Sequence, residues 1–271
     1  MVGRNYMIIM IGRIKKLYKL LPPLLSRDIK ERYAGSALGI FWTFLQPLLF
    51  ILIYWMVFSK IMKIRVQTDT GDVPFFAFLL SGILPWFALQ EGVTMGATAI
   101  LDKRHLIKKV IFPLELFPLS SVLSAFIHYG IGMIIFLPAY FFWKGDVSVL
   151  QILCIVFLIV LQIFLTSGLA LLFSALSVYI RDIIQILGVA FQVLFYISTI
   201  LYPITSVPGS LKILVQLNPV TAMAEAYHSA ILYNRVPELY GAIYLISFTL
   251  LAVASGTWVF RKLKKGFADV L

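Results

Sequence analysis

The chain has 271 residues, of which 61% are hydrophobic and 13% are charged, and this balance excludes an ordinary soluble domain. The formal net charge is +11, but the cations flank apolar stretches, a pattern typical of contact with anionic lipid headgroups and not with nucleic acid. A single cysteine, Cys154, excludes an intrachain disulfide framework and a cysteine-based metal cluster. The composition therefore predicts an integral membrane protein.

The first predicted segment, residues 1–37, is basic and amphipathic. It holds eight lysines and arginines against two acids. Pro22 and Pro23 divide it into two pieces, each with apolar residues at helical spacing, such as Leu25 and Ile29 in the second piece. We expect helices that lie in the membrane interface on the cytoplasmic side. The candidate site residues of this interface helix, all in the second piece, are Arg27, Asp28, Lys30, Arg32 and Tyr33.

Six apolar stretches follow, each about long enough to cross a bilayer as a helix. A hydrocarbon core of about 30 Å needs roughly 20 helical residues, and the continuous runs lack the alternation of a barrel strand. The predicted spans are 38–59, 74–98, 114–143, 149–180, 183–202 and 239–260. The sequence thus predicts an all-α integral membrane domain of six transmembrane helices over residues 38–260, followed by a basic cytoplasmic tail over residues 261–271.

The connections between these spans are alternately rich and poor in cations. Counted together with the two ends of the chain, one side of the membrane receives seventeen lysines and arginines and the other side receives six. The positive-inside rule therefore predicts that both termini are cytoplasmic and that residues 203–238 are external.

The external connection over residues 203–238 is predicted to re-enter the membrane. It is long, moderately apolar and interrupted by prolines. Its pattern predicts a short helix over 211–217 and a second helix over 221–232, started by Asn218 and Pro219, because proline suits the first turn of a helix. A loop that stays outside the membrane is the alternative.

Short motifs along nearly the whole chain resemble the type-2 ABC exporter permeases, in particular the branch that exports polysaccharides and polyol phosphates, such as O-antigen, capsule and teichoic acid transporters. The motifs are Arg27-Asp28-Ile29-Lys30-Glu31-Arg32-Tyr33, then Ser36-Ala37-Leu38-Gly39 with Trp42 and Pro47, Lys109-Val110-Ile111-Phe112-Pro113 with Leu116 and Pro118, Arg181-Asp182-Ile183, Leu217-Asn218-Pro219, and Phe267-Ala268-Asp269. One departure is His228, where such permeases often carry an arginine.

The resemblance implies a homodimeric channel in the bacterial inner membrane that exports a lipid-linked glycan or polyol-phosphate polymer. Two copies of a separate ATPase subunit, which bind ATP and Mg, would drive it. In agreement, the sequence has no Gly-x-x-x-x-Gly-Lys-Ser/Thr phosphate-binding motif. The chain itself is then not an enzyme and holds no cofactor or metal. Two alternatives remain: a permease of the same fold that exports a drug or small lipid, and an integral-membrane acyl- or glycosyltransferase.

In the light of this resemblance, two cytoplasmic connections are candidate contacts with the ATPase. The connection over residues 101–113 is densely basic, and its apolar residues suit a groove of a partner protein. The alternative is that these cations determine topology and contact only lipid headgroups, or that Arg181 and Asp182 form a local ion pair. The candidate residues are Asp102, Lys103, Arg104, His105, Lys108, Lys109, Arg181 and Asp182.

The fifth predicted span carries a stripe of polar, small and aromatic residues on one helix face. Its members recur at alternating steps of three and four. Polar side chains in membranes usually face a bundle interior or a water-filled cavity, so we predict that this face lines the channel. Helix packing with interhelical hydrogen bonds is the alternative. The stripe consists of Gln185, Gly188, Gln192, Phe195, Thr199 and Tyr202.

The first predicted span carries a ridge of large side chains at every fourth position. Aromatic faces offer flat, weakly polar surfaces along which the C–H faces of sugars can slide, so we predict that the ridge also lines the channel. An aromatic belt at the membrane boundaries is the alternative. The ridge consists of Trp42, Gln46, Phe50, Tyr54 and Phe58.

Two acids are predicted near membrane depth. Glu115, at the cytoplasmic boundary, is expected to reach the interface or to pair with Lys108 or Lys109. Glu91, in the cytoplasmic half of the second span, is a candidate for a cavity-facing ion site.

Overall fold

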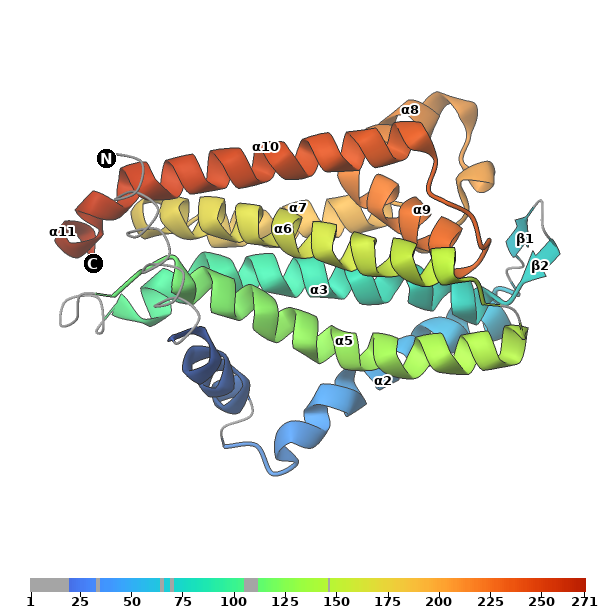
Figure 1. The fold of residues 1–271 in the computed structure, drawn as a ribbon, viewed down its shortest axis with the longest axis horizontal. Coiled ribbons are helices and arrows are strands. Elements are labelled where there is room, and N and C mark those ends of the chain that lie inside the picture. The colour runs from blue at the N-terminus through green and yellow to red at the C-terminus, as the bar shows by residue number, and fades with distance from the viewer. Residues whose placement is uncertain (1–19, 33–34, 64–65, 69–70, 105–111, 146) are drawn as a thin grey trace, which may run out of the picture.

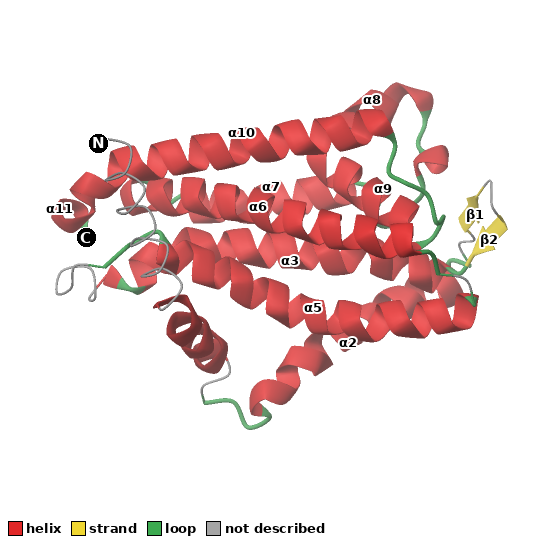
Figure 2. Ribbon diagram, viewed as in Figure 1, coloured by secondary structure: helices red, strands yellow, loops and turns green. Residues whose placement is uncertain are grey.

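The computed structural model describes the protein as a helical bundle (Figures 1 and 2). The residues outside this description are 1–19, 33–34, 64–65, 69–70, 105–111 and 146. Four of the predicted site residues, Tyr33, His105, Lys108 and Lys109, therefore lie outside the described residues.

Four long helices run side by side and form the body of the bundle (Figure 1). They are α3 (Phe75–Asp102), α5 (Leu116–Lys144), α6 (Val149–Tyr179) and α10 (Leu239–Leu263). Each of the four is long and apolar enough to cross a membrane, and each coincides with a predicted span. The ends of α5 and α6 follow local rules: Gly145 ends α5 in the left-handed region, and the Ser148 hydroxyl accepts a hydrogen bond from the Gln151 amide at the start of α6.

The other two predicted spans correspond to shorter apolar helices. They are α2 (Trp42–Trp55), which continues as the π-helical turn η2 (Met56–Ile61), and α7 (Ile183–Tyr196). With 14 residues, α7 is about 21 Å long, less than the hydrocarbon core of about 30 Å. Within the part of the chain that the structure describes there are thus six apolar helices at the predicted places, of which four have membrane-spanning length.

Helix α3 lies at the centre of the bundle. Of the residues in its apolar, membrane-length stretch, 78% are buried, a larger share than in the other three long helices. It packs against α5 and α6 and also meets α7 and a short helix of the last connection. Large side chains such as Phe78 and Trp86 fill the space between these helices. Because side chains occupy the interior, the described bundle of one copy is a packed core.

The long connection between α7 and α10 folds into short helices. They are η3 (Ile204–Ser206), α8 (Gly209–Leu217) and α9 (Pro219–Ile231). The Asn218 side chain caps α9 by accepting a hydrogen bond from the Val220 amide at 2.9 Å, and Pro219 occupies the first turn. Helix α9 is largely buried and packs against α3, α6 and α10. Both helices that the sequence predicts in this connection are present. Their insertion into the membrane stays a prediction.

The remaining elements lie at the two ends of the bundle. A hairpin of two antiparallel strands, which the all-α prediction did not include, joins η2 to α3 and pairs Val66 with Val73. At the other end, α10 continues into two short turns against which Tyr179 packs. Residues 20–32 form a helix that lies beside the bundle at this same end, the left end in Figure 1. The short elements are η1 (Gly39–Phe41), β1 (Val66–Thr68), β2 (Gly71–Val73), η4 (Lys264–Gly266) and α11 (Phe267–Val270).

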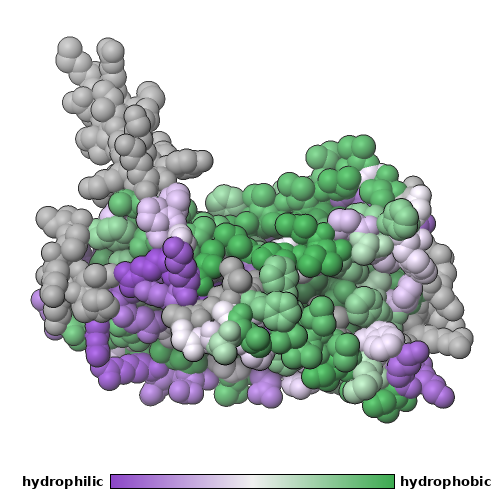
Figure 3. Space-filling model, turned by 90° about the horizontal axis from the view of Figure 1, so that it is seen from below, coloured by the Kyte–Doolittle hydropathy of each residue, from purple (hydrophilic) through white to green (hydrophobic). Residues whose placement is uncertain are grey.

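The surface agrees with a membrane environment. In Figure 3, hydrophobic residues cover the middle of the molecule, and hydrophilic residues gather mainly at the left end, the end of α11. Large exposed apolar side chains include Leu150 on α6 and Leu251 on α10. Such a belt is costly in water and favourable in hydrocarbon.

Candidate functional site

A buried ion pair ties the 20–32 helix to the end of α3. Asp28 and Lys103 are only 6% and 7% exposed, although both are ionisable. The Lys103 Nζ atom lies 2.6 Å from Asp28 Oδ1, and the Ser120 hydroxyl of α5 donates to Asp28 Oδ2 at 2.6 Å. Lys103 Nζ also lies 5.3 Å from the centre of the Phe117 ring. Both oxygens of the Asp28 carboxylate are thus bound, which compensates its burial.

A second ion pair holds the next turn of the same helix. Arg32 pairs with Glu91 of α3 and donates to the Ser124 hydroxyl of α5 at 3.4 Å. The Tyr129 hydroxyl donates to Glu91 Oε2 at 2.8 Å. Glu91, which the sequence suggested as a cavity-facing acid, is therefore bound by an arginine and a tyrosine of the same chain. The sequence did not reveal this pairing because the partners are 59 and 38 positions away.

The start of α5 is tied to the segment that follows α10. Glu115 Oε1 lies 2.5 Å from the Nζ atom of Lys264 in η4. Lys264 is a partner of Glu115 that the sequence did not suggest, and the expected partners Lys108 and Lys109 lie outside the described residues. Close by, Phe267 of α11 is fully buried and packs edge-on against Phe260 at 5.6 Å. The last residues are thus packed against the bundle.

The predicted partner contacts fall into two groups. Asp102 and Arg104, on either side of Lys103, are exposed. Arg181 and Asp182, between α6 and α7, are also exposed. Lys103 alone among the described members of this set turns inward, toward Asp28. The exposed four lie at the end of the bundle where α11 and the 20–32 helix are found.

The stripe on α7 divides between the surface and the core. Gln185 and Gln192 are exposed, with Gly188 between them. Phe195 is buried and stacks on Trp86 at 5.7 Å, and Thr199 is fully buried after the end of the helix. At the same end, the Tyr202 hydroxyl donates to the Tyr196 carbonyl, and the Asn218 amide donates to the Leu194 carbonyl at 2.8 Å. The polar half of the stripe therefore faces outward, Phe195 anchors the end of α7 against α3, and Asn218 links this end to the start of α9.

The ridge on α2 divides in a similar way. Gln46 and Phe50 are exposed, and Trp42 is half-buried. The Tyr54 ring lies 6.2 Å from Phe58 and 6.5 Å from Phe195 of α7. Phe58 in turn lies 5.7 Å from Phe75 of α3. The two predicted channel faces thus meet at the hairpin end of the bundle, through an aromatic cluster.

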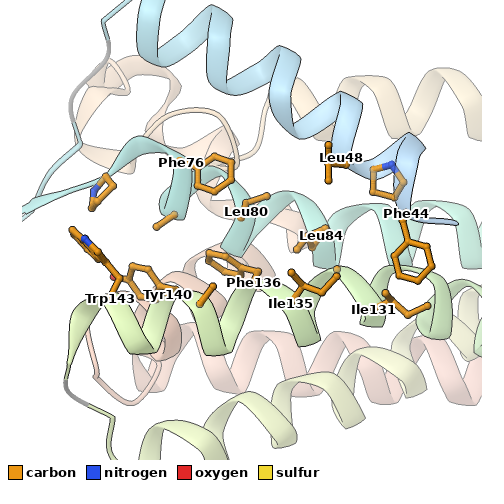
Figure 4. A pocket seen from close by; sticks show the side chains of 15 residues that line it. Phe44, Leu48, Phe76, Leu80, Leu84, Ile131, Ile135, Phe136, Tyr140 and Trp143 are labelled. Atoms are coloured by element: carbon orange, nitrogen blue, oxygen red, sulfur yellow. The ribbon is translucent and has the colours of Figure 1, made fainter. Parts of the chain in front are cut away.

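An apolar groove between α2, α3 and α5 was not expected from the sequence (Figure 4). It has a volume of about 530 Å³. Its α5 wall contains Ile131 and Ile135, one helical turn apart, and its floor contains Leu80 and Leu84 of α3 in the same relation. Trp143 stands at one end of the groove. The lining is almost entirely apolar, and its side-chain polar groups are the Tyr140 hydroxyl and the Trp143 indole N–H.

His228, the departure from the family pattern, is part of the packed core. It is fully buried in α9, its ring stacks on Phe78 at 4.1 Å, and its Nε2 atom lies 3.2 Å from the Phe78 carbonyl oxygen. Gly82 of α3 faces the same ring. Among the described residues, no three His, Cys, Asp or Glu side chains come together as a metal site. His228 therefore holds α9 against α3.

Comparison with known proteins identifies the family. Residues 22–232 match the family described as ABC-2 type transporter. The chain belongs to the ABC-2 type transporter family. In this ABC-2 transporter chain the matched segment runs from the 20–32 helix to the end of α9. It includes the Asp28–Lys103 pair, the α2 ridge and the α7 stripe.

Curated relatives of this ABC-2 transporter chain align over most of its length. An O-antigen export system permease protein (RfbA) of Klebsiella pneumoniae is 27% identical over 255 residues, which are 94% of this chain and 96% of the relative. The RfbA of Myxococcus xanthus is 28% identical over 268 residues, 96% of this chain and 99% of the relative. A polysialic acid transport protein (KpsM) of Escherichia coli is 24% identical over 240 residues, 88% and 91% of the two chains.

Proposed function

We propose that this chain is the membrane-spanning permease subunit of an ABC transporter that exports a lipid-linked polysaccharide or polyol-phosphate polymer across the bacterial inner membrane. The observation that carries the proposal is the alignment with O-antigen export and polysialic acid transport proteins over at least 88% of the chain. The four long apolar helices supply the membrane domain that such a subunit needs. The relatives favour neither a drug or small-lipid exporter nor an acyl- or glycosyltransferase.

The conduit in this proposal lies between two copies of the chain, because the described interior of one copy is filled by side chains such as Trp86 and Tyr227. Gln185 and Gln192 are exposed on α7, where hydrocarbon would leave their amides without partners. We assign this polar face to the conduit of a homodimer, with Phe195 behind it as a support. The proposed lining comprises Trp42, Gln46, Phe50, Tyr54, Phe58, Gln185, Gln192 and Tyr202, and the buried Phe195 and Thr199 support it from behind.

The energy source in this proposal is a separate ATPase subunit, present in two copies, that binds ATP and Mg. Its docking surface is the end of the bundle where Asp102, Arg104, Arg181 and Asp182 are exposed. His105, Lys108 and Lys109 belong to the same proposed surface by sequence. The permease chain itself transports and does not catalyse. Both termini and this docking surface are cytoplasmic in the proposal, and α8 and α9 lie in an external connection that re-enters the membrane.

Export in living cells tests the proposal. Deletion of the chain should remove the polymer from the cell surface and leave lipid-linked polymer inside, and the unaltered chain should restore export. Gln192→Trp should then reduce surface polymer at least tenfold, because a homodimer places the bulky ring in the conduit twice. Ile186→Trp is the matched control, because Ile186 is an exposed apolar residue of the same helix and lies about 120° around the helix axis from Gln192.

The two parts of the proposal fail in different ways. A deletion strain with normal surface polymer and no internal lipid-linked polymer would contradict the export function. Equal loss of export in both tryptophan variants, or loss only at Ile186, would contradict the assignment of the glutamine face to the conduit.

A further inference from the structure

The connection between α3 and α5 is held at both of its described flanks by segments that are distant in sequence. At its start, Lys103 is bound to Asp28 of the 20–32 helix. At its end, Glu115 is bound to Lys264, which follows α10. The same flanks share one small apolar cluster, in which Ile100 and Phe117 are buried. A displacement of this connection therefore acts directly on elements outside α3 and α5.

The Asp28–Lys103 contact is the stiffer of the two links. Its members are nearly excluded from water, whereas the side chains of Glu115 and Lys264 are about one-third exposed. Separating a buried ion pair leaves two uncompensated charges in a medium of low polarity, so the pair strongly opposes separation. Two apolar side chains can slide past each other without such a penalty. A buried polar pair cannot, and in packed helices such pairs fix the position of one helix along the other.

The 20–32 helix is also held in register along α5. Asp28 and Arg32 are four residues apart, and their hydroxyl partners Ser120 and Ser124 are four residues apart on α5. Residues four apart on a helix are neighbours on its surface. The spacing from Asp28 to Arg32 therefore equals the spacing from Ser120 to Ser124, and the two contacts can form together. The chain then passes from this helix to α2 within about ten residues, and α2 carries the proposed conduit ridge.

We infer that Asp28 and Lys103 form a mechanical link that transmits ATP-driven movement of the α3–α5 connection to the 20–32 helix and from there to α2. The inference rests on the proposed function, since the movement originates in an ATPase docked at this end. Lys103, which the sequence suggested as a direct ATPase contact, acts in this view through Asp28. Both are positioning residues: they contact neither polymer nor ATP.

The test uses the complex of the full chain with its ATPase subunit. The double variant Asp28→Leu with Lys103→Met keeps an apolar contact but removes the ionic link. We expect this variant to assemble with the ATPase, to retain ATP hydrolysis within about twofold, and to lose export at least tenfold. The charge-reversed pair, Asp28→Lys with Lys103→Asp, should recover part of the export. Lys265→Met is the matched control, because Lys265 is an exposed lysine at the same end of the bundle.

Each outcome decides for or against the link. Normal export by the apolar double variant would overturn it, since sliding contacts would then suffice. Parallel loss of ATPase assembly and export, without recovery by the charge-reversed pair, would also overturn it and make Lys103 a direct contact. If the unaltered chain binds no ATPase, the proposed function fails first, and that result is read from the unaltered chain alone.

Discussion

Replacement of Gly256 by alanine should destabilise the crossing of α10 and α6. At this crossing the two backbones touch: a Cβ atom added at Gly256 would lie 2.0 Å from the carbonyl oxygen of Gly168. A Cβ atom added at Gly168 would lie 2.6 Å from the carbonyl carbon of Ala252. The clashing atoms belong to backbone, which cannot rotate away as the end of a side chain can. The helices must therefore separate.

The size of the effect follows from the geometry. The added methyl group falls about 1 Å inside the shortest approach that atoms tolerate, so the helices must separate by at least that amount. Overpacking of this kind costs about 1–3 kcal/mol, and rigid partners on both sides favour the upper half of that range. A loss of about 2–3 kcal/mol lowers the ratio of folded to unfolded protein roughly 30-fold to 150-fold. That is a large part of a total stability of about 5–15 kcal/mol.

The assay is unfolding of the purified protein in detergent, followed by circular dichroism and by the fraction that stays monodisperse. Gly241→Ala is the matched control on the same helix, because no heavy atom lies within 4 Å of the added Cβ. Alanine should stabilise that position by about 0.5–1 kcal/mol relative to glycine. The unfolding midpoint of Gly256→Ala should shift to milder conditions than that of the unaltered chain, and the midpoint of Gly241→Ala should not. Equal stability of the Gly256→Ala and unaltered proteins would refute the close approach of α6 and α10.

Further predictions concern buried hydrogen bonds, capping and orientation. Gln162→Leu should cost about 1–3 kcal/mol of stability, because it strands the hydroxyl of Tyr227, whose bond to Gln162 measures 2.7 Å; Tyr227→Phe in the same chain should recover part of the loss in detergent unfolding. Asn218→Ala should cost about 1 kcal/mol through the lost cap of α9, and Asn218→Ser should cost less, as amide exchange of α9 will report. Once Cys154 is replaced, an impermeant thiol reagent on intact cells should label a cysteine at Ser210 and spare one at Arg181, and the reverse pattern would contradict the proposed orientation.

The positions of the helices follow from local patterns. Apolar runs of about 20 residues predict helices wherever the backbone must bond to itself. The start of α9 at Asn218 and Pro219 could be predicted from the sequence, because the capping hydrogen bond joins residues only two positions apart. The lengths of α2 and α7 were less predictable. The predicted fifth span ran to Tyr202, but α7 ends at Tyr196, where Tyr202 and Asn218 bind the last carbonyls.

The pairing of charges did not follow from local patterns. Periodicity in the 20–32 helix placed Leu25 and Ile29 on one side and Arg27, Lys30 and Glu31 on the other, and it assigned no partner to Asp28. In the structure Asp28 is the most buried described residue of this helix. A hydropathy pattern scores a residue by its own chemistry, whereas the burial of a carboxylate depends on whether a cation 75 positions away can reach it.

The sequence by itself determined three things: that this is a membrane protein, at which residues its apolar helices occur, and which family motifs it carries. Each depends on apolar run length, cation distribution or capping, which are properties of neighbouring residues. Only the tertiary structure decided that Lys103 binds Asp28, that Glu91 binds Arg32, that the α7 stripe is half surface and half core, and that Gly168 and Gly256 meet. These contacts join helices far apart in the chain. Their energies depend on the distance and burial of two partners at once, quantities that a linear pattern does not contain.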